Sequence, residues 1–283
     1  MKRNLYMRFP GWTAKALTLS YDDGVQQDIR LMETLDRYGL KCTFNINSGS
    51  IPPEGKVYPA GQVHRRMTAS ECVALYKNSG HEVAVHGHTH PFLEQLPQSG
   101  VVYEIIKDRE ELERMFGCII KGMAYPYGTF SDEVVEALRA CGISYSRTTV
   151  STEKFNIPTD WLRMPATCHH NNPRLMELAE KFAAIDGTKL TEPKLFYLWG
   201  HSYEFDDKDN WDVIEKFSEY MGGRDDVWYA TNIEIYDYIK AYKSLEFSAD
   251  MSMVHNPTAT TLYFRFNSEN YSLVPGETRA FGN

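Results

Sequence analysis

The sequence predicts an α/β fold in which parallel strands close into a barrel and helices cover its outside. Two observations support this fold class. Apolar runs of strand length alternate with segments of helical periodicity through most of the 283-residue chain. Repeated strand–helix units imply a parallel sheet with helical crossovers. Six or seven such units in about 240 residues suit a barrel better than an open sheet.

The first unit illustrates how each element is inferred. Residues 16–21 form an apolar run of strand length. Residues 28–38 follow with Leu31 and Leu35 at helical spacing, and Gly39 is a typical helix end. The same reasoning predicts further strands at residues 42–46, 82–85, 119–124, 143–146, 195–199 and 227–230. It predicts further helices at residues 68–80, 101–116, 131–142, 173–184, 211–221 and 233–242.

The composition changes after about residue 245. Residues 261–266 are β-prone, and Asn-Pro, Asn-Ser-Glu-Asn and Pro-Gly-Glu separate the short apolar pieces around them. Such a pattern is typical of a few antiparallel strands joined by turns. We therefore expect residues 1–245 to form the main domain and residues 246–283 to form a small β-rich appendage.

Charge and cysteine content exclude several functional classes. A formal net charge of −8 argues against nucleic acid or an anionic membrane as the main partner. No apolar run approaches the roughly 20 residues of a membrane span, and polar residues interrupt the N-terminus where a secretory signal needs an apolar core. The five cysteines are odd in number and show no CxxC spacing, which is typical of free thiols in a reducing compartment. These features together predict a cytoplasmic protein.

Side chains suited to metal binding and acid–base chemistry follow several of the predicted strands. They are Asp22 and Asp23, the triplet His86, His88 and His90, the segment Tyr125-Pro126-Tyr127-Gly128, and His201. In parallel α/β folds the loops at the carboxyl ends of the strands build the active site. We therefore expect these groups to share one site.

Two imidazoles and one carboxylate suit a divalent metal that keeps a position open for water. A second carboxylate can then accept a proton from that water, so the adjacent Asp22 and Asp23 could divide the two roles. The spacing does not tell which two of the three histidines bind. An Asp-Asp-Gly sequence after a strand is by itself also typical of a turn or a helix N-cap.

These motifs resemble those of the polysaccharide deacetylase family, the NodB homology or carbohydrate esterase family 4 group. Residues 20–24, Ser-Tyr-Asp-Asp-Gly, resemble its Thr-Phe-Asp-Asp-Gly motif, and residues 86–90 resemble its His-(Ser/Thr)-x-x-His motif. Residues 125–128 resemble most of its Arg-x-Pro-Tyr-Gly motif, and residues 198–201 resemble its last motif, an apolar strand that ends in histidine. The order of the motifs agrees from residue 16 to about residue 205.

The resemblance implies a distorted (β/α) barrel with seven strands and a role for each matching residue. It implies a single divalent metal, zinc or in some members cobalt, nickel or iron, with the ligands Asp23, His86 and His90. It implies that Asp22 is the general base, that the backbone N–H of Tyr127 stabilises the oxyanion, and that His201 is the general acid. His88 falls on a variable position of the motif and receives no role.

The sequence departs from the family pattern at Ala124, where the third motif has an arginine that pairs with the catalytic aspartate. Residues 160–163, Asp-Trp-Leu-Arg, resemble the fourth motif. We hypothesise that Arg163 supplies the missing charge to the catalytic aspartate and that Asp160 orients the general acid.

Two aromatic residues, Trp161 and Tyr203, are candidates for stacking on a sugar, with core packing as the alternative. The backbone and ring of Tyr127 are further candidates for substrate contact.

The sequence thus predicts a metal-dependent hydrolase that removes acetyl groups from N-acetylated amino sugars or their oligomers and releases acetate. An acetylated carbohydrate is then the expected partner. Two alternatives keep the fold: an esterase for O-acetylated glycans such as xylan, and a hydrolase for a small amide. A third alternative is a non-catalytic carbohydrate-binding protein, which Ala124 favours and the retained aspartates and histidines oppose.

Overall fold

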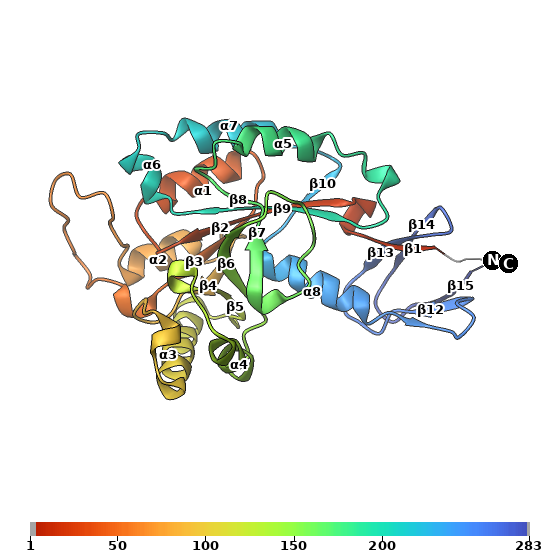
Figure 1. Ribbon diagram of the computed structural model, residues 1–283, viewed down its shortest axis with the longest axis horizontal. Coiled ribbons are helices and arrows are strands. Elements are labelled where there is room, and N and C mark those ends of the chain that lie inside the picture. Colours follow the sequence, from red (N-terminus) through yellow and green to blue (C-terminus); the bar gives the residue numbers. More distant parts are fainter. Residues whose placement is uncertain (1–3, 282–283) are drawn as a thin grey trace.

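The computed structural model describes residues 4–281 and is built around a parallel barrel with helices on its outside (Figure 1). The barrel strands are β2 (Lys15–Asp22), β3 (Cys42–Ile46), β4 (Glu82–Val85), β5 (Gly122–Ala124), β6 (Tyr145–Ser151), β7 (Met164–Ala166), β8 (Cys168–His169) and β9 (Lys194–Gly200). They follow the order β7-β6-β5-β4-β3-β2-β9-β8, and each neighbouring pair is parallel. β10 (Val227–Tyr229) pairs with the start of β2.

The barrel closes through one continuous segment. β7 pairs with β6 and β8 pairs with β9, and only Thr167 separates β7 from β8. The two ends of the sheet are therefore pieces of a single irregular strand, and seven strands complete the ring. This confirms the predicted distorted seven-stranded barrel. Pro165 and the short length of each piece explain why the sequence pattern did not reveal this strand.

Helices cover the barrel on opposite sides, with α5 and α7 on one side and α3 and α4 on the other (Figure 1). The surrounding helices are α1 (Asp28–Arg37), α2 (Ala69–Tyr76), α3 (Gln98–Phe116), α4 (Asp132–Ala140), α5 (Leu175–Ala183), α6 (Tyr203–Asp207) and α7 (Asp212–Met221). Amphipathic patterns drive this packing: α1, for example, buries Leu31 and Leu35. Thr68 and Glu71 form a capping box at the start of α2. None of the helices described between residues 4 and 281 has the length and apolar character needed to cross a membrane.

The helix α8 (Asn232–Lys243) covers the amino ends of the strands. The Asn232 side chain accepts from Thr18 (Oδ1, 2.9 Å) and donates to the Tyr197 hydroxyl (2.7 Å) inside the barrel. The first backbone N–H groups of α8 reach Thr43 and Glu82, which lie near the starts of β3 and β4. With this end closed by α8, the carboxyl ends of the strands are left for the functional loops.

The C-terminal strands and one N-terminal strand form two small antiparallel sheets, gathered at one end of the molecule in Figure 1. One sheet contains β1 (Leu5–Arg8), β13 (Leu262–Phe266) and β14 (Glu269–Leu273); the other contains β11 (Glu246–Phe247), β12 (Met253–His255) and β15 (Thr278–Ala280). They share an apolar core that includes Phe264, Phe266 and Phe281. Antiparallel strands are present where the sequence predicted them. The division at residue 245 stays a prediction, because β1 comes from the other end of the chain.

Candidate active site

The side chains of Asp23, His86 and His90 converge just beyond the carboxyl ends of β2 and β4. One ligand atom from each lies within 4.8 Å of the others. The Nε2 atom of His90 is 4.0 Å from the Asp23 carboxylate, and the two imidazole rings are 4.8 Å apart, centre to centre. The structure therefore brings together the three residues that the sequence predicted as metal ligands.

Three residues of the site have left-handed backbone conformations that non-glycine residues seldom adopt. The φ angles are +86° at Asp23, +59° at His90 and +58° at Tyr127. Such conformations cost free energy and persist where the surrounding structure imposes them, often at functional sites. Here they occur in the loops that follow β2, β4 and β5, and these loops meet at the carboxyl ends of the strands.

The surroundings of His86 leave one ring nitrogen free to bind a metal. Its Nδ1 lies 2.8 Å from the carbonyl oxygen of Ala124, so Nδ1 must carry the proton and Nε2 keeps its lone pair. Burial lowers the pKa of His86, and burial likewise lowers the pKa of His90 to about 4. Two neutral imidazoles and a carboxylate form a donor set that fits a zinc-like divalent ion.

Asp22 lies between this cluster and His201. Its Oδ2 atom is 3.7 Å from Nε2 of His86 and 3.7 Å from Nε2 of His201, and Asn45 donates to its Oδ1 (2.8 Å). Burial alone would raise the pKa of Asp22, but the guanidinium of Arg147 and the two histidines outweigh that effect and lower it. Asp22 is therefore an ionised carboxylate held within reach of both histidines.

Arg147, and not Arg163, supplies the charge beside Asp22. The Arg147 guanidinium is fully buried, donates to Oδ2 of Asp22 and lies 4.4 Å from the Trp199 ring. Arg147 on β6 is the register partner of Ala124 on β5. The arginine that is missing at Ala124 is thus replaced from the neighbouring strand at the same height in the barrel.

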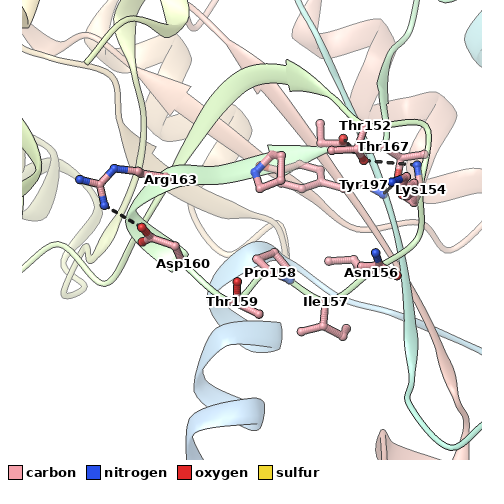
Figure 2. A pocket seen from close by; sticks show the side chains of 13 residues that line it. Thr152, Lys154, Asn156, Ile157, Pro158, Thr159, Asp160, Arg163, Thr167 and Tyr197 are labelled. Atoms are coloured by element: carbon pink, nitrogen blue, oxygen red, sulfur yellow. Dashed lines mark hydrogen bonds and ion pairs between the residues drawn. The ribbon is translucent and has the colours of Figure 1, made fainter. Parts of the chain in front are cut away.

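The hypothesis for Arg163 is therefore wrong. Arg163 pairs with Asp160 (2.7 Å) and Asp132 (2.5 Å), and Figure 2 shows it beside Asp160 at the edge of a pocket of about 450 Å³. Residues 161–163 form a short 3₁₀ helix that precedes β7, one strand further round the barrel than β6. None of the residues that line this pocket belongs to the Asp23–His86–His90 cluster.

Glu204 orients His201, in place of the predicted Asp160. Nδ1 of His201 is 2.8 Å from Oε1 of Glu204, while Asp160 bonds to the Leu162 amide and to Arg163. Burial would lower the pKa of His201, but the hydrogen bond to Glu204 and the charge of Asp22 raise it above its usual value. The surroundings of His201 thus favour its protonated form, whereas those of His86 and His90 favour the neutral ring.

A second cluster of possible metal-binding groups surrounds Glu204. It consists of His169, His201 and Glu204, whose ligand atoms also lie within 4.8 Å of one another. Asn171 and Lys208 donate to Oε2 of Glu204, the latter at 3.0 Å. The sequence analysis missed Glu204 because α6 is only five residues long and too short to show helical periodicity.

Two of the three aromatic candidates lie near the site and one does not. The ring of Tyr127 lies 4.5 Å from His90, and its backbone N–H finds no acceptor within residues 4–281. Tyr203 lies 5.3 Å from His201, and burial raises the pKa of its hydroxyl to about 12. Trp161, by contrast, packs edge-on against Tyr236 of α8, the helix at the amino ends of the strands. It is therefore a packing residue and is not brought to the site.

Two residues from the loop between β3 and α2 complete the surroundings of Asp23. His64 lies 3.2 Å from Oδ2 and Arg66 donates to Oδ1 at 2.9 Å. Burial would raise the pKa of Asp23, but these two contacts lower it well below its usual value. Neither residue stands in a motif or a periodic segment, so the sequence contained no signal for them. His88, which received no predicted role, faces away and contacts Ser48 at 2.9 Å.

Comparison with known proteins adds independent findings. Residues 12–146 match a family model described as polysaccharide deacetylase. Peptidoglycan-N-acetylglucosamine deacetylase PgdA of Listeria monocytogenes is 26% identical over 143 residues, which cover 50% of this chain and 27% of that protein. The chain thus spans about a quarter of the length of this curated relative.

Two solved structures share the fold. One is a candidate polysaccharide deacetylase from Mycobacterium smegmatis, with a TM-score of 0.60 and 16% identity over 84% of this chain and 94% of that chain. The other is the Xyl-CE4 domain of a multidomain xylanase from the hindgut metagenome of Trinervitermes trinervoides. Its TM-score is 0.53, with 14% identity over 80% of this chain and 92% of that domain. At these identities the similarity shows the fold of the barrel.

Proposed function

We propose, from the premise that this chain belongs to the polysaccharide deacetylase family, that it removes acetyl groups from N-acetylated amino sugars or their oligomers with the help of a divalent metal. One observation carries the proposal. A potential metal site, a buried carboxylate and a histidine that favours the protonated form lie in a row at the carboxyl ends of the barrel strands.

Asp23, His86 and His90 would hold the metal, with zinc the ion that best suits two imidazoles and one carboxylate. When bound, the metal makes water more acidic and polarises the acetyl carbonyl. Arg66 and His64 hold the Asp23 carboxylate from its outer side. The hydrogen bond from His86 to Ala124 keeps that ring in the tautomer that metal binding needs.

Asp22 would accept the proton of the attacking water. Its pKa is lowered, so it is ionised throughout the neutral range, and Asn45 and Arg147 fix both of its oxygens. The free backbone N–H of Tyr127 would donate to the oxyanion that forms at the acetyl carbon.

His201 would donate a proton to the departing nitrogen. Its Nδ1 faces Glu204 and its Nε2 faces Asp22, so the proton on Nε2 points into the site. An amine leaves only when it is protonated, whereas an alkoxide departs more readily, and this requirement favours an amide substrate over an ester. Tyr203 and the ring of Tyr127 would line the place of the sugar.

Metal content and acetate release together test the proposal. We expect about one metal per chain after equilibration with zinc, and acetate release from N-acetylglucosamine oligomers in preference to acetylated xylan. Asp23→Ala should lose both metal and activity, while Asp212→Ala, which removes an exposed carboxylate paired with Lys216, should retain both. Activity without bound metal contradicts the proposal, and saccharide binding without turnover favours a non-catalytic protein.

A further inference from the structure

A groove of about 450 Å³ lies between the barrel and the C-terminal sheets, separate from the site described above. Its lining includes Arg8, Trp12, Asp186, Thr188, Arg265 and Asn270. These residues come from β1 and the turn after it, from the segment after α5, and from β13 and β14. The groove therefore exists only because the N-terminal strand joins the C-terminal sheet.

Trp12 presents a large aromatic ring to this groove. Its side chain is 43% exposed, yet it is held in place: Nε1 donates to the Tyr271 carbonyl (3.1 Å) and the ring packs edge-on against Tyr263 at 5.1 Å. Its backbone is left-handed, with φ at +61°. An exposed indole on a strained backbone costs stability without adding to the core. A rigid aromatic face of this kind can pack against the apolar face of a ring-shaped ligand.

Two arginines that line the groove lack an anionic partner. Arg8 is 3% exposed and donates to two backbone carbonyls, those of Met7 (2.8 Å) and Leu190 (2.7 Å). Arg265 donates to the carbonyl of Thr188 (2.6 Å). Within the described part of the chain, residues 4–281, neither guanidinium has a carboxylate within 4.0 Å. Burial and the charge of Arg265 together lower the pKa of Arg8, so the two cations repel each other.

The two carboxylates of the groove do not compensate this charge because each is already paired. Asp186 lies 3.0 Å from Lys189, and Asp226 lies 2.6 Å from the buried Lys15. The uncompensated charge in the groove is therefore positive. Guanidinium groups form paired, charge-assisted hydrogen bonds with carboxylates, and such bonds gain strength where water is excluded.

We propose that this groove binds an acidic saccharide, with a sugar ring against Trp12 and its carboxylate between Arg8 and Arg265. The observation behind it is the combination of a fixed, exposed indole with two unpaired guanidinium groups. The side-chain amide of Asn270 and the hydroxyl of Thr188 supply hydrogen-bonding partners for the hydroxyl groups of the sugar. The site is independent of the proposed deacetylation and would give the chain a second contact with a glycan.

A titration of the ¹⁵N-labelled 283-residue chain tests this proposal. The probes are glucuronate, glucose and glucose 6-phosphate, and the readout is the indole N–H resonance of Trp12, identified by its loss in Trp12→Phe. We expect a saturable shift with glucuronate and an affinity at least about tenfold higher than for glucose, because a hydrogen bond between charged groups is stronger than one between neutral groups. No shift with glucuronate, or equal affinity for glucose, would overturn the proposal. Tighter binding of glucose 6-phosphate would overturn the choice of a carboxylate.

Variants separate the two parts of the site. Arg265→Gln should reduce the affinity for glucuronate to that for glucose. Arg279→Gln, on β15 of the other small antiparallel sheet and paired with Glu277, should change neither affinity. Trp12→Ala should abolish binding of glucuronate. Because this variant lacks the indole N–H, binding is measured on the ligand by one-dimensional saturation-transfer NMR. Because Trp12 supports Tyr263, Arg265→Gln provides the decisive result if Trp12→Ala does not fold. Acetate release from a monosaccharide should be unchanged in Arg265→Gln and Trp12→Ala. A failure of the proposed saccharide-binding groove is therefore distinguishable from a failure of the proposed deacetylase activity.

Discussion

Two clusters of histidine and carboxylate groups lie side by side at the carboxyl ends of the strands, and they differ in where the ring protons sit. In the Asp23–His86–His90 cluster, Nδ1 of His86 faces the Ala124 carbonyl and must be protonated, so Nε2 offers a lone pair. In the other cluster, Nδ1 of His169 accepts from the Asn171 amide at 3.1 Å, so Nε2 carries the proton and points at Glu204.

The difference assigns different tasks to similar sets of residues. The first cluster presents electron pairs to a cation, whereas the second presents N–H groups to an anion. Burial would raise the pKa of Glu204, but its contacts with His169, His170 and His201 outweigh that effect and lower it far below its usual value. Asn171 and Lys208 also donate to this carboxylate. The direction of hydrogen bonds around each ring, more than the residue types, thus distinguishes a metal site from a carboxylate held by donors.

Asp22 joins the two clusters, and removal of its arginine should have the largest effect. Arg147→Met leaves the buried Asp22 carboxylate without its guanidinium partner, which should cost about 3–5 kcal/mol of stability. A displaced Asp22 should also lower kcat by about 100-fold. Chemical denaturation and acetate-release kinetics measure these two effects.

Arg163→Met is the matched control, because its ion pairs with Asp132 and Asp160 are exposed to solvent and should contribute little to stability. Arg147→Lys keeps the charge and covers the case in which Arg147→Met does not fold. An equal loss of kcat in the Arg147 and Arg163 variants would contradict the assignment of Arg147 to Asp22.

The second largest effect on kcat should come from replacing Glu204, the carboxylate of the second cluster. Glu204 raises the pKa of His201, so His201 stays protonated to a higher pH than an ordinary imidazole. Glu204→Gln removes that contribution and lowers the pKa of His201. The alkaline limb of the kcat profile should therefore move to lower pH, with a loss of about 10- to 100-fold at neutral pH and a smaller loss in acid.

A pH profile of kcat, measured on protein with a confirmed metal content, provides the test. Glu215→Gln, which alters an exposed pair with Arg30, should leave the profile in place. A uniform loss of kcat with an unshifted alkaline limb would mean that Glu204 acts only on folding or on position.

The comparison also explains which features the sequence could predict. The barrel and the convergence of Asp23, His86 and His90 follow from strands whose carboxyl ends share one edge, and this is a local and regular pattern. The identity of the partner of Asp22 depends on the register between β5 and β6, which places Arg147 opposite Ala124. Arg147 is 125 residues away from Asp22 along the chain. No periodicity encodes such a register, and a motif match to residues 160–163 therefore pointed to the wrong arginine.

The same limit applies to the groups that surround the carboxylates. Glu204 lies on a helix of five residues, and His64 and Arg66 lie on a loop without regular structure. Their contacts with His201 and Asp23 depend on how loops fold over the barrel, which the spacing of residues along the chain does not determine.

His169→Gln should have the smallest effect on kcat, and its zinc stoichiometry tests directly whether the two clusters differ in metal binding. His169→Gln removes a third possible ligand from the second cluster but keeps a side-chain amide that can donate to Glu204. Because Nδ1 of His169 already accepts from Asn171, we expect wild type and variant to bind the same single zinc ion, with kcat changed by no more than about threefold. Elemental analysis after equilibration with excess zinc measures the stoichiometry, and His255→Gln, which alters a partly buried histidine of β12 far from both clusters, is the control. Two ions per wild-type chain and one per His169→Gln chain would instead mean that the ring can turn its lone pair toward a cation and that both clusters hold metal.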